Sequence, residues 1–409
     1  MPRSRARVSP EVEASLPFTG KSRAFRTLGE FDRLVDSAVE TGKVDPLWRK
    51  VVAAGRMPLI FGDETAVFLY RGTAGKVAAR GDFNLPYSRL AESDLWMGRR
   101  RFEPDARVEY RIRIDSRRWI QDPLNPFTET GGWGTNSVVR MPRYVAPEFA
   151  LPRSGIKHGA LSENLLFYSE ALGYDVNYRV YTPSGFRRRK NLPVIYVVDG
   201  QDFADPSMGA MVNVLDNLIA AGRIRPVMAV FVDPRDPFTG ENRREEEFVR
   251  DALDDNPLGD FIAGELVPAV DGAFPTEPSP DARAILGFSF GGAFASHMGL
   301  AFSDVFHLVG IQSPYIIRKW ILETYREADR LPFRAFISHG TYDGGATSIR
   351  LRNILRDKGY PLLYVQTHEG HSFGNVRSLL DDVLVYFFGA HRSGGRVARV
   401  GCGPSGAKR

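Results

Sequence analysis

The sequence has a single cysteine, Cys402, which stands in a glycine-rich stretch near the end of the chain. One thiol cannot form an internal disulfide, so nothing in the sequence calls for an oxidising compartment. Long apolar runs are also missing, and no apolar segment follows the basic residues 1–7 as it would in a secretory signal. We therefore expect a cytoplasmic protein without a membrane contact.

Metal-binding and nucleic-acid-binding patterns are lacking as well. The sequence has no H-E-x-x-H motif and no cysteine pair, and His368 and His371 alone are too few ligands for a catalytic ion. The arginine-rich runs 99–101 and 187–190 lack interleaved aromatics that could stack on bases, so solvated loops are the better interpretation. We expect no cofactor, no metal and no nucleic-acid partner.

The length and the patterning predict two folded domains. The chain has 409 residues, 43% of them hydrophobic, and a net charge of +5 that suits an anionic substrate only weakly. Short strand-like segments separated by glycine and proline turns predict a β-sandwich over 46–150. It follows a partly flexible extension, 1–45, with a short helix near 31–39, and a proline-rich linker at 141–147 precedes the second domain.

The second domain, over 151–392, has a different rhythm, and a disordered tail is expected over 393–409. Short apolar runs, such as 194–198 and 227–232, alternate with helix-length segments. This alternation predicts an α/β fold with a mainly parallel sheet covered by helices on both faces. Active groups in such sheets collect at the carboxyl ends of the strands.

A candidate nucleophile follows one of these strands. The sequence Gly-Phe-Ser-Phe-Gly at 287–291 is a G-x-S-x-G motif, and it stands between a strand at 283–286 and a helix-forming stretch. Glycines permit the tight turn that lifts Ser289 above the sheet, and the N–H of Phe290 can then hold a developing oxyanion. The alternative interpretation is a glycine-flanked serine that only turns a corner.

The base must follow the serine and the acid in chain order. Among the later histidines, His368 and His371 fall after the last predicted strand, and His371, in the loop beside Gly370, is the better candidate. His368 lies closer to the strand end, where a structural role is more common.

The acid should end the preceding strand, and Asp343 stands in the glycine-rich turn at that place. We expect its carboxylate to bond the imidazole, although an aspartate that caps the next helix is the other interpretation. A second oxyanion donor should follow an early strand, which points to the N–H of Gly200 or Gln201 unless this segment is a plain turn.

With these residues the chain resembles the enterochelin-esterase-like branch of the putative esterase family, which also includes feruloyl esterases and acyltransferases. The resemblance covers about 156–390 and rests on the segments 196–202, 215–222, 226–234, 242–247, 340–343 and 369–374 together with the serine motif. The front part is similar to the early-set, glycogen-binding-like sandwich of siderophore esterases through 77–84, 93–96 and 122–126.

The resemblance implies an α/β-hydrolase that cleaves carboxylic esters through an acyl-enzyme. The substrate would be a small ester, anionic or aromatic, with a siderophore trilactone and feruloyl or acetyl esters as the candidates. Arg243 would lie near the site, or it would form a surface salt bridge. Acyl transfer is an alternative outcome, and a glycan-binding protein with a vestigial hydrolase domain, using Trp96, Trp119 and Trp133, is a different function.

Overall fold

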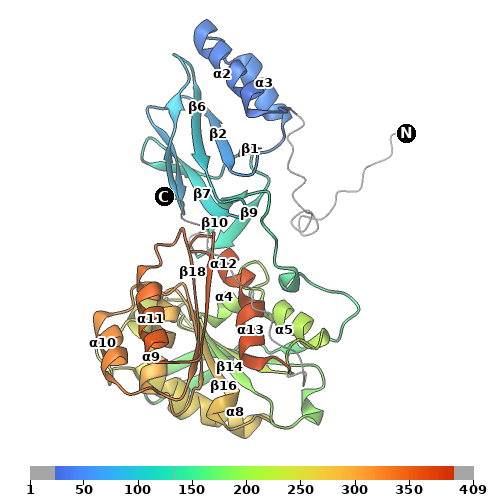
Figure 1. Cartoon of the computed structure of the whole chain (residues 1–409). Coiled ribbons are helices and arrows are strands. Elements are labelled where there is room, and N and C mark those ends of the chain that lie inside the picture. The colour runs from blue at the N-terminus through green and yellow to red at the C-terminus, as the bar shows by residue number, and fades with distance from the viewer. Residues whose placement is uncertain (1–23, 133, 391–409) are drawn as a thin grey trace.

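The computed structural model describes residues 24–132 and 134–390. Its chain folds into a smaller part, built from short strands and two helices, and a larger part in which helices surround a sheet (Figure 1). Residues 1–23 of the predicted extension, the predicted tail 393–409, Cys402 and Trp133 lie outside the described residues. The predicted domain boundaries stay predictions.

The smaller part is a sandwich of two antiparallel sheets. One sheet has the order β1 (Leu59–Phe61), β2 (Thr65–Arg71), β6 (Leu95–Arg101), β5 (Ser88–Arg89). The other has the order β4 (Asn84–Pro86), β3 (Val77–Gly81), β7 (Arg107–Ile114), β10 (Gly134–Arg140), β9 (Thr128–Gly131), with β8 (Arg118–Ile120) beside β7. Phe68 of β2 and Tyr110 of β7 meet in the core between the sheets, with ring centroids 5.3 Å apart.

Two helices cover the outer face of the first sheet. Helix α2 (Leu28–Thr41) is capped by the Thr27 hydroxyl, which accepts the N–H of Glu30 at 3.1 Å, and α3 (Asp45–Ala53) follows it. Both pack apolar side chains on Val67 and Leu69 of β2. The helix predicted near 31–39 is therefore present in a longer form, whereas the sequence pattern does not predict α3.

The larger part has a nine-stranded sheet. Its order is β11 (Ala160–Leu161), β13 (Tyr174–Thr182), β15 (Met228–Asp233), β14 (Val194–Val198), β16 (Arg283–Phe288), β17 (Leu308–Gln312), β18 (Arg334–Gly340), β19 (Leu362–Thr367), with β12 (Leu165–Ser169) on β13. The strands β11 to β13 pair antiparallel, β13 pairs antiparallel with β15, and the strands from β15 to β19 pair parallel. The chain has the α/β-hydrolase fold that the sequence predicts.

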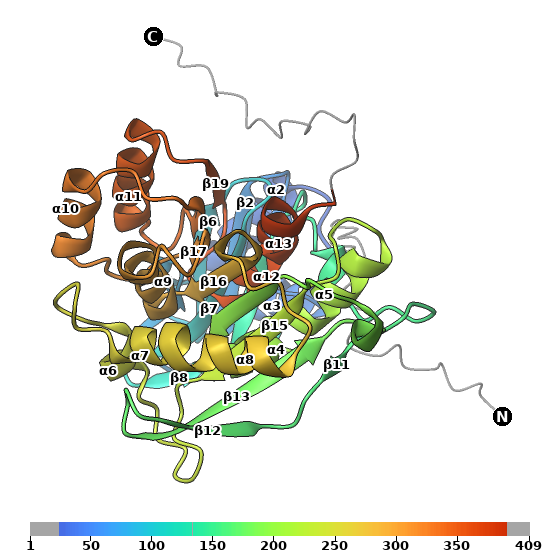
Figure 2. The ribbon, with the colours of Figure 1, turned by 90° about the horizontal axis from the view of Figure 1, so that it is seen from below.

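Helices cover both faces of this sheet, as Figure 2 shows from below. Side chains of β14 divide between the two layers, because Tyr196 points to one core and Ile195 to the other. One layer contains α7 (Pro257–Asp260), a π-helical turn (Phe261–Leu266), α8 (Val267–Ala273), α9 (Phe290–Ala301), α10 (Lys319–Glu327) and α11 (Ala346–Asp357). The other contains α4 (Gly200–Ala204), α5 (Met211–Ala220), α12 (Phe373–Ser378) and α13 (Leu380–Phe388).

A short helix and the segment between the two parts connect these elements. A short helix, α6 (Arg244–Phe248), lies in the long connection after β15 and contacts α9. The segment that joins the two parts runs along α5, where the Asn217 amide donates to the carbonyls of Phe149 and Leu151 at 2.7 and 2.9 Å. In the described ranges, no helix combines the length and the apolar character needed to cross a membrane.

Candidate active site

Ser289 stands at a sharp turn between β16 and α9. Its backbone has φ 61° and ψ −121°, a conformation that costs about 1–3 kcal/mol for a residue with a side chain. The flanking glycines make the turn possible, since a Cβ on Gly287 would lie 2.0 Å from the carbonyl oxygen of Gly291. The strand, turn and helix predicted around the serine are thus present, and the side chain is held at the carboxyl end of a central strand.

His371 reaches this serine from the far end of the sequence. Its Nε2 lies 2.8 Å from Ser289 Oγ, within hydrogen-bond distance. The imidazole packs on Phe288, with ring centroids 4.7 Å apart. The other candidate, His368, instead pairs with Asp105 at 2.7 Å and makes no bond to the serine among the described residues.

The surroundings of His371 keep its imidazole neutral. Burial lowers the pKa of His371, the nearby charge of Arg244 lowers it further, and the charge of Asp343 raises it. Because a general base must be unprotonated to accept a proton, this environment suits the role of base at neutral pH.

Asp343 contributes to the site through its charge. Its carboxylate accepts the N–H groups of Gly340 at 2.9 Å and Gly345 at 3.0 Å, both within its own turn. No hydrogen bond joins it to His371 in the ranges 24–132 and 134–390, which differs from the expected direct bond. The two bonds hold the carboxylate within its own turn, and its effect on His371 is through charge.

Three backbone N–H groups at the starts of helices are the candidate oxyanion donors. Phe290 is the first residue of α9, and Gly200 and Gln201 begin α4. No backbone bond between described residues uses these N–H groups, as is usual at the start of a helix. A Cβ on Gly200 would lie 2.4 Å from the backbone of Phe231, so only glycine fits there.

Comparisons with known proteins find likenesses to esterases. Residues 169–333 match the family model described as putative esterase. This part of the chain is therefore similar to the putative esterase family. An uncharacterised protein of Bacillus subtilis is 26% identical over 173 residues, 42% of this chain and 69% of its own length. An endo-1,4-beta-xylanase/feruloyl esterase of Xylanibacter ruminicola is 29% identical over 178 residues, 41% of this chain but only 23% of its own.

Solved structures extend the likeness to most of this chain. The enterobactin esterase of Shigella flexneri superposes with a TM-score of 0.65 at 21% identity, over 80% of this chain and 94% of its own. The ferric enterobactin esterase of Salmonella typhimurium gives 0.64 at 18% identity, over 79% and 94%. Since the match covers more of the chain than the esterase domain alone, the fold of the smaller part is shared as well.

The neighbouring side chains of Arg243 and Arg244 make different contacts. Arg243, the expected substrate contact, forms an ion pair with Asp236 and lies 3.9 Å from the ring centroid of Tyr174. Neither of these contacts reaches the serine, and a role of Arg243 in substrate binding stays a prediction. Arg244 Nη2 instead donates to the carbonyl of Phe288, next to the nucleophile, at 3.2 Å.

Sequence reasoning missed Arg244 because it stands beside the chosen residue in an arginine pair. Its Nε donates to the buried carboxylate of Asp199 at 2.7 Å, which links α6 to the start of α4. Arg244 and Phe248 lie on one face of α6 toward the nucleophile turn, but a helix of five residues is too short for helical spacing to reveal this in the sequence.

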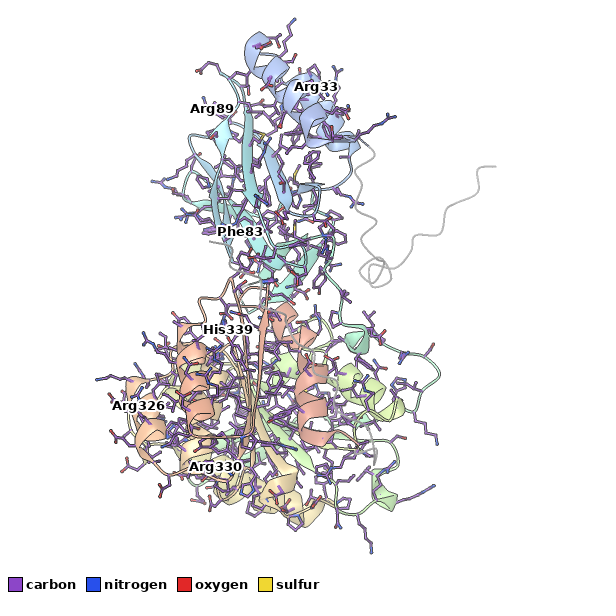
Figure 3. The ribbon with its side chains drawn as sticks, viewed as in Figure 1. Arg33, Phe83, Arg89, Arg326, Arg330 and His339 are labelled. Atoms are coloured by element: carbon purple, nitrogen blue, oxygen red, sulfur yellow. The ribbon has the colours of Figure 1, made fainter. Side chains whose placement is uncertain are left out.

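The front sandwich also reaches the site. Figure 3 labels Phe83 at the end of the sandwich that faces the larger part, and His339 at the facing end of that part. At this junction, the N–H of Arg107 donates to the carbonyl of His368 at 3.0 Å. Sequence reasoning missed Arg107 and Asp82, because contacts between distant domains leave no local pattern.

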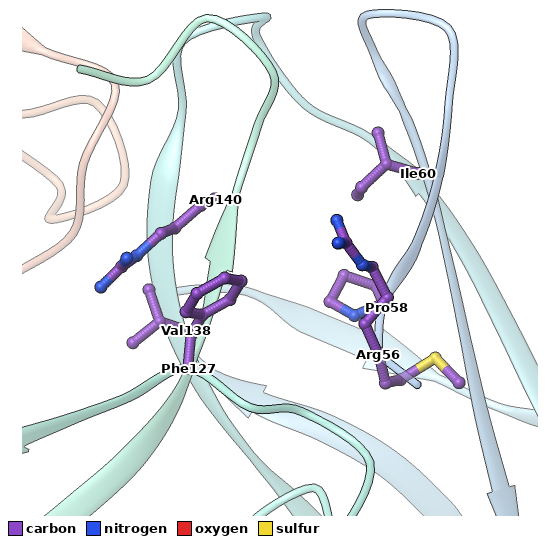
Figure 4. A pocket seen from close by; sticks show the side chains of 7 residues that line it. Arg56, Pro58, Ile60, Phe127, Val138 and Arg140 are labelled. Atoms are coloured by element: carbon purple, nitrogen blue, oxygen red, sulfur yellow. The ribbon is translucent and has the colours of Figure 1, made fainter. Parts of the chain in front are cut away.

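A separate pocket lies in the sandwich, away from the catalytic residues (Figure 4). The residues that line it all belong to the smaller part: Arg56, Met57, Pro58, Ile60, Phe127, Val138 and Arg140. Neither Ser289 nor His371 contributes to it, so it does not extend the esterase site.

Proposed function

We propose that this chain is a serine esterase that hydrolyses carboxylic esters through an acyl-enzyme. The observation that carries the proposal is the 2.8 Å contact between His371 Nε2 and Ser289 Oγ at a strained strand–turn–helix element. An esterase-family match over 169–333 supports the same chemistry.

The reaction has two halves. His371 accepts the hydroxyl proton as Ser289 Oγ attacks the ester carbonyl, and the N–H groups of Phe290 and of Gly200 or Gln201 stabilise the oxyanion. The alcohol then leaves with the proton from His371, and the acyl group stays on Ser289. Water, deprotonated by His371, attacks the acyl-enzyme, the bond between the acyl carbon and Ser289 Oγ breaks as His371 returns the proton to Oγ, and the acid is released. Asp343 stabilises the imidazolium through its charge in both halves.

The surroundings of the serine favour an aromatic or apolar ester. Tyr315 is 50% exposed, and its ring lies 5.3 Å from Phe290 and 6.1 Å from His371. The adjacent Ile316 is 50% exposed. Siderophore trilactones with catechol groups and feruloyl esters both carry aromatic rings, so the proposal includes both as substrates. The acceptor of the acyl group can be water or a second alcohol.

The glycan-binding alternative has less support. Trp96 is 6% exposed, and its Nε1 donates to the carbonyl of Gly72 at 3.2 Å, as expected for a core residue. Trp119 is 47% exposed, but the guanidinium of Arg113 lies 5.2 Å from its ring centroid. Tight binding of the chain to soluble α-glucans without esterase activity would favour this function.

The test is an ester panel with p-nitrophenyl acetate and butyrate, feruloyl esters and ferric enterobactin. We expect Ser289→Ala to lower kcat by at least about 10³-fold, because the nucleophile is lost. His371→Ala should act similarly, whereas His368→Gln should keep most activity because its ring pairs with Asp105. Wild-type turnover by Ser289→Ala would overturn the proposal.

A further inference from the structure

The loop that carries the catalytic histidine is held from outside the esterase domain. It runs from the end of β19 at Thr367 to the start of α12 at Phe373, with His371 between them. The sandwich strand β7 begins against this loop, where Arg107 and Glu369 form a parallel bridge and the Arg107 N–H bonds the His368 carbonyl. The loop that carries His371 is therefore in contact with the sandwich, which contains none of Ser289, Asp343 and His371.

The side chain of Arg107 lies at the centre of this contact. It is 1% exposed, and its guanidinium is bonded by the sandwich residues Glu109 at 3.2 Å and Glu129 at 2.7 Å. On the other side it lies 3.5 Å from Glu369 and donates to Ser372 Oγ at 3.3 Å, both in the histidine loop. A buried cation needs anionic or polar partners, so the guanidinium holds the oxygens of Glu109 and Glu129 in the sandwich close to those of Glu369 and Ser372 in the histidine loop.

The start of α12 fits closely against the same group. A Cβ on Gly374 would lie 2.2 Å from the Cζ of Arg107, so any larger residue there would displace the guanidinium. Glu129 also binds Arg377 of α12 at 2.7 Å. The loop is thus tied to the sandwich on both sides of His371.

Asp82 makes the contact nearest to the base. It stands in the turn between β3 and β4, and its Oδ2 accepts the N–H of Glu109 at 2.7 Å. The backbone N–H of His371 lies close enough to lower the pKa of this carboxylate, but burial outweighs that effect and raises the pKa of Asp82 to about 7. Gly370 leaves room for it, since a Cβ there would lie 1.8 Å from Asp82 Cγ.

These contacts matter because the imidazole has few restraints of its own. Among the described residues its one hydrogen bond is to Ser289, and Asp343 acts on it through charge alone. The ring's position therefore depends on the backbone of His371 and on packing against Phe288. A misplacement of about 1 Å at a reacting group can cost about 10²-fold in rate.

We propose that Asp82 and Arg107 are positioning residues of the esterase reaction, through which the front sandwich sets the backbone of His371 opposite Ser289. The inference rests on the proposed function and deepens it, because it makes the sandwich part of the catalytic unit. Neither residue touches the reacting atoms, and both act through the histidine loop.

The experiment compares Asp82→Asn with Asp105→Asn in the full chain. The first variant keeps the shape of the side chain but replaces one acceptor oxygen with an NH₂ donor, which alters its contact with the backbone of Glu109 and of Gly370. The second removes the exposed pair between Asp105 and His368, which spans the same junction without touching His371. We expect Asp82→Asn to lower kcat at least about tenfold with KM within about twofold, and Asp105→Asn to leave both nearly unchanged.

Two further measurements separate positioning from loss of fold. The melting temperature of Asp82→Asn should stay close to that of wild type, and the neutral triester diethyl p-nitrophenyl phosphate should still label Ser289 to full stoichiometry, but more slowly. Gly370→Ala disturbs the same contact from the esterase side and should reproduce the kcat loss if Asp82→Asn does not fold. Failure to fold in both variants counts against a pure positioning role.

The outcomes also separate this inference from the proposed function. If Ser289→Ala is inactive while Asp82→Asn, Gly370→Ala and Arg107→Lys all keep the wild-type kcat, the positioning role is wrong and the esterase assignment stands. If Ser289→Ala keeps wild-type activity, the esterase assignment itself is wrong.

Discussion

Ser289 and His371 are 82 positions apart in the sequence and 2.8 Å apart in space. Each could be chosen from the sequence because its neighbours show local chemistry: glycines around the serine, and a glycine loop after a strand for the histidine. Asp343 was chosen in the same way, but its carboxylate bonds the N–H groups of Gly340 and Gly345 rather than the imidazole.

The first prediction concerns Asp343 and the pH profile. Activity needs neutral His371, whose pKa lies below its ordinary value of about 6.5, so the acid limb of kcat/KM should have its midpoint below that pH. Asp343 is the group that raises this pKa, and Asp343→Asn should move the limb to still lower pH. It should also lower kcat roughly 10- to 100-fold, because the imidazolium loses its countercharge.

Arg244→Met supplies the opposite case. The charge of Arg244 lowers the pKa of His371, so its removal should move the acid limb to higher pH. Stopped-flow or plate assays with p-nitrophenyl butyrate between pH 4.5 and 8 would record the acid limb of each variant. A limb that does not move in Asp343→Asn would mean that another group sets the charge of the base.

At the scale of elements, the strand-to-helix turn at 287–291 was predictable, whereas the short helices around the site were not. The apolar run before Ser289 and the glycines after it determine β16, the turn and α9 locally. Helices α4 and α6 have five residues each, too few for a periodic pattern to stand out. They nevertheless place Gly200 and Arg244 at the site.

The second prediction tests this turn through Gly287. A Cβ on Gly287 would meet the Gly291 carbonyl oxygen at 2.0 Å, so Gly287→Ala must displace backbone. We expect a loss of about 1–3 kcal/mol in the free energy of unfolding and a large fall in kcat, because Ser289 moves with the turn. Urea unfolding and the butyrate assay measure the two effects.

Gly272→Ala in α8 is the matched control. A Cβ there has no neighbour within 4 Å, and the residue is helical, so the substitution should be neutral or stabilise by up to about 1 kcal/mol. Equal behaviour of the two alanine variants would contradict the steric role assigned to Gly287.

At the scale of the whole molecule, the two parts are coupled by buried charges. The guanidinium of Arg107 is shared between Glu109 and Glu129 of the sandwich and Glu369 of the esterase domain. Separating the parts would leave these charges without their partners, which is costly. We infer that the sandwich and the esterase domain unfold together.

The third prediction follows from this coupling. Differential scanning calorimetry should show one transition for the wild-type chain. Arg107→Met leaves the buried carboxylates of Glu109 and Glu369 without their paired cation and should lose about 3–5 kcal/mol of stability. Arg101→Met removes an arginine that is 76% exposed in its pair with Glu64, so it should leave the stability close to that of wild type. Two well-separated transitions in the wild type would contradict the coupling.

The sequence by itself determined the α/β-hydrolase fold of the catalytic part, the serine turn and the choice of His371, because each depends on periodicity or on turn chemistry within a few residues. Only the tertiary structure decided that Arg244 rather than Arg243 lies against the nucleophile turn, that Asp343 acts through charge, and that Asp82 and Arg107 hold the histidine loop. The physical reason is range: hydrophobic periodicity and turn preference act between near neighbours, whereas buried ion pairs and backbone contacts between domains exist only once distant segments have packed.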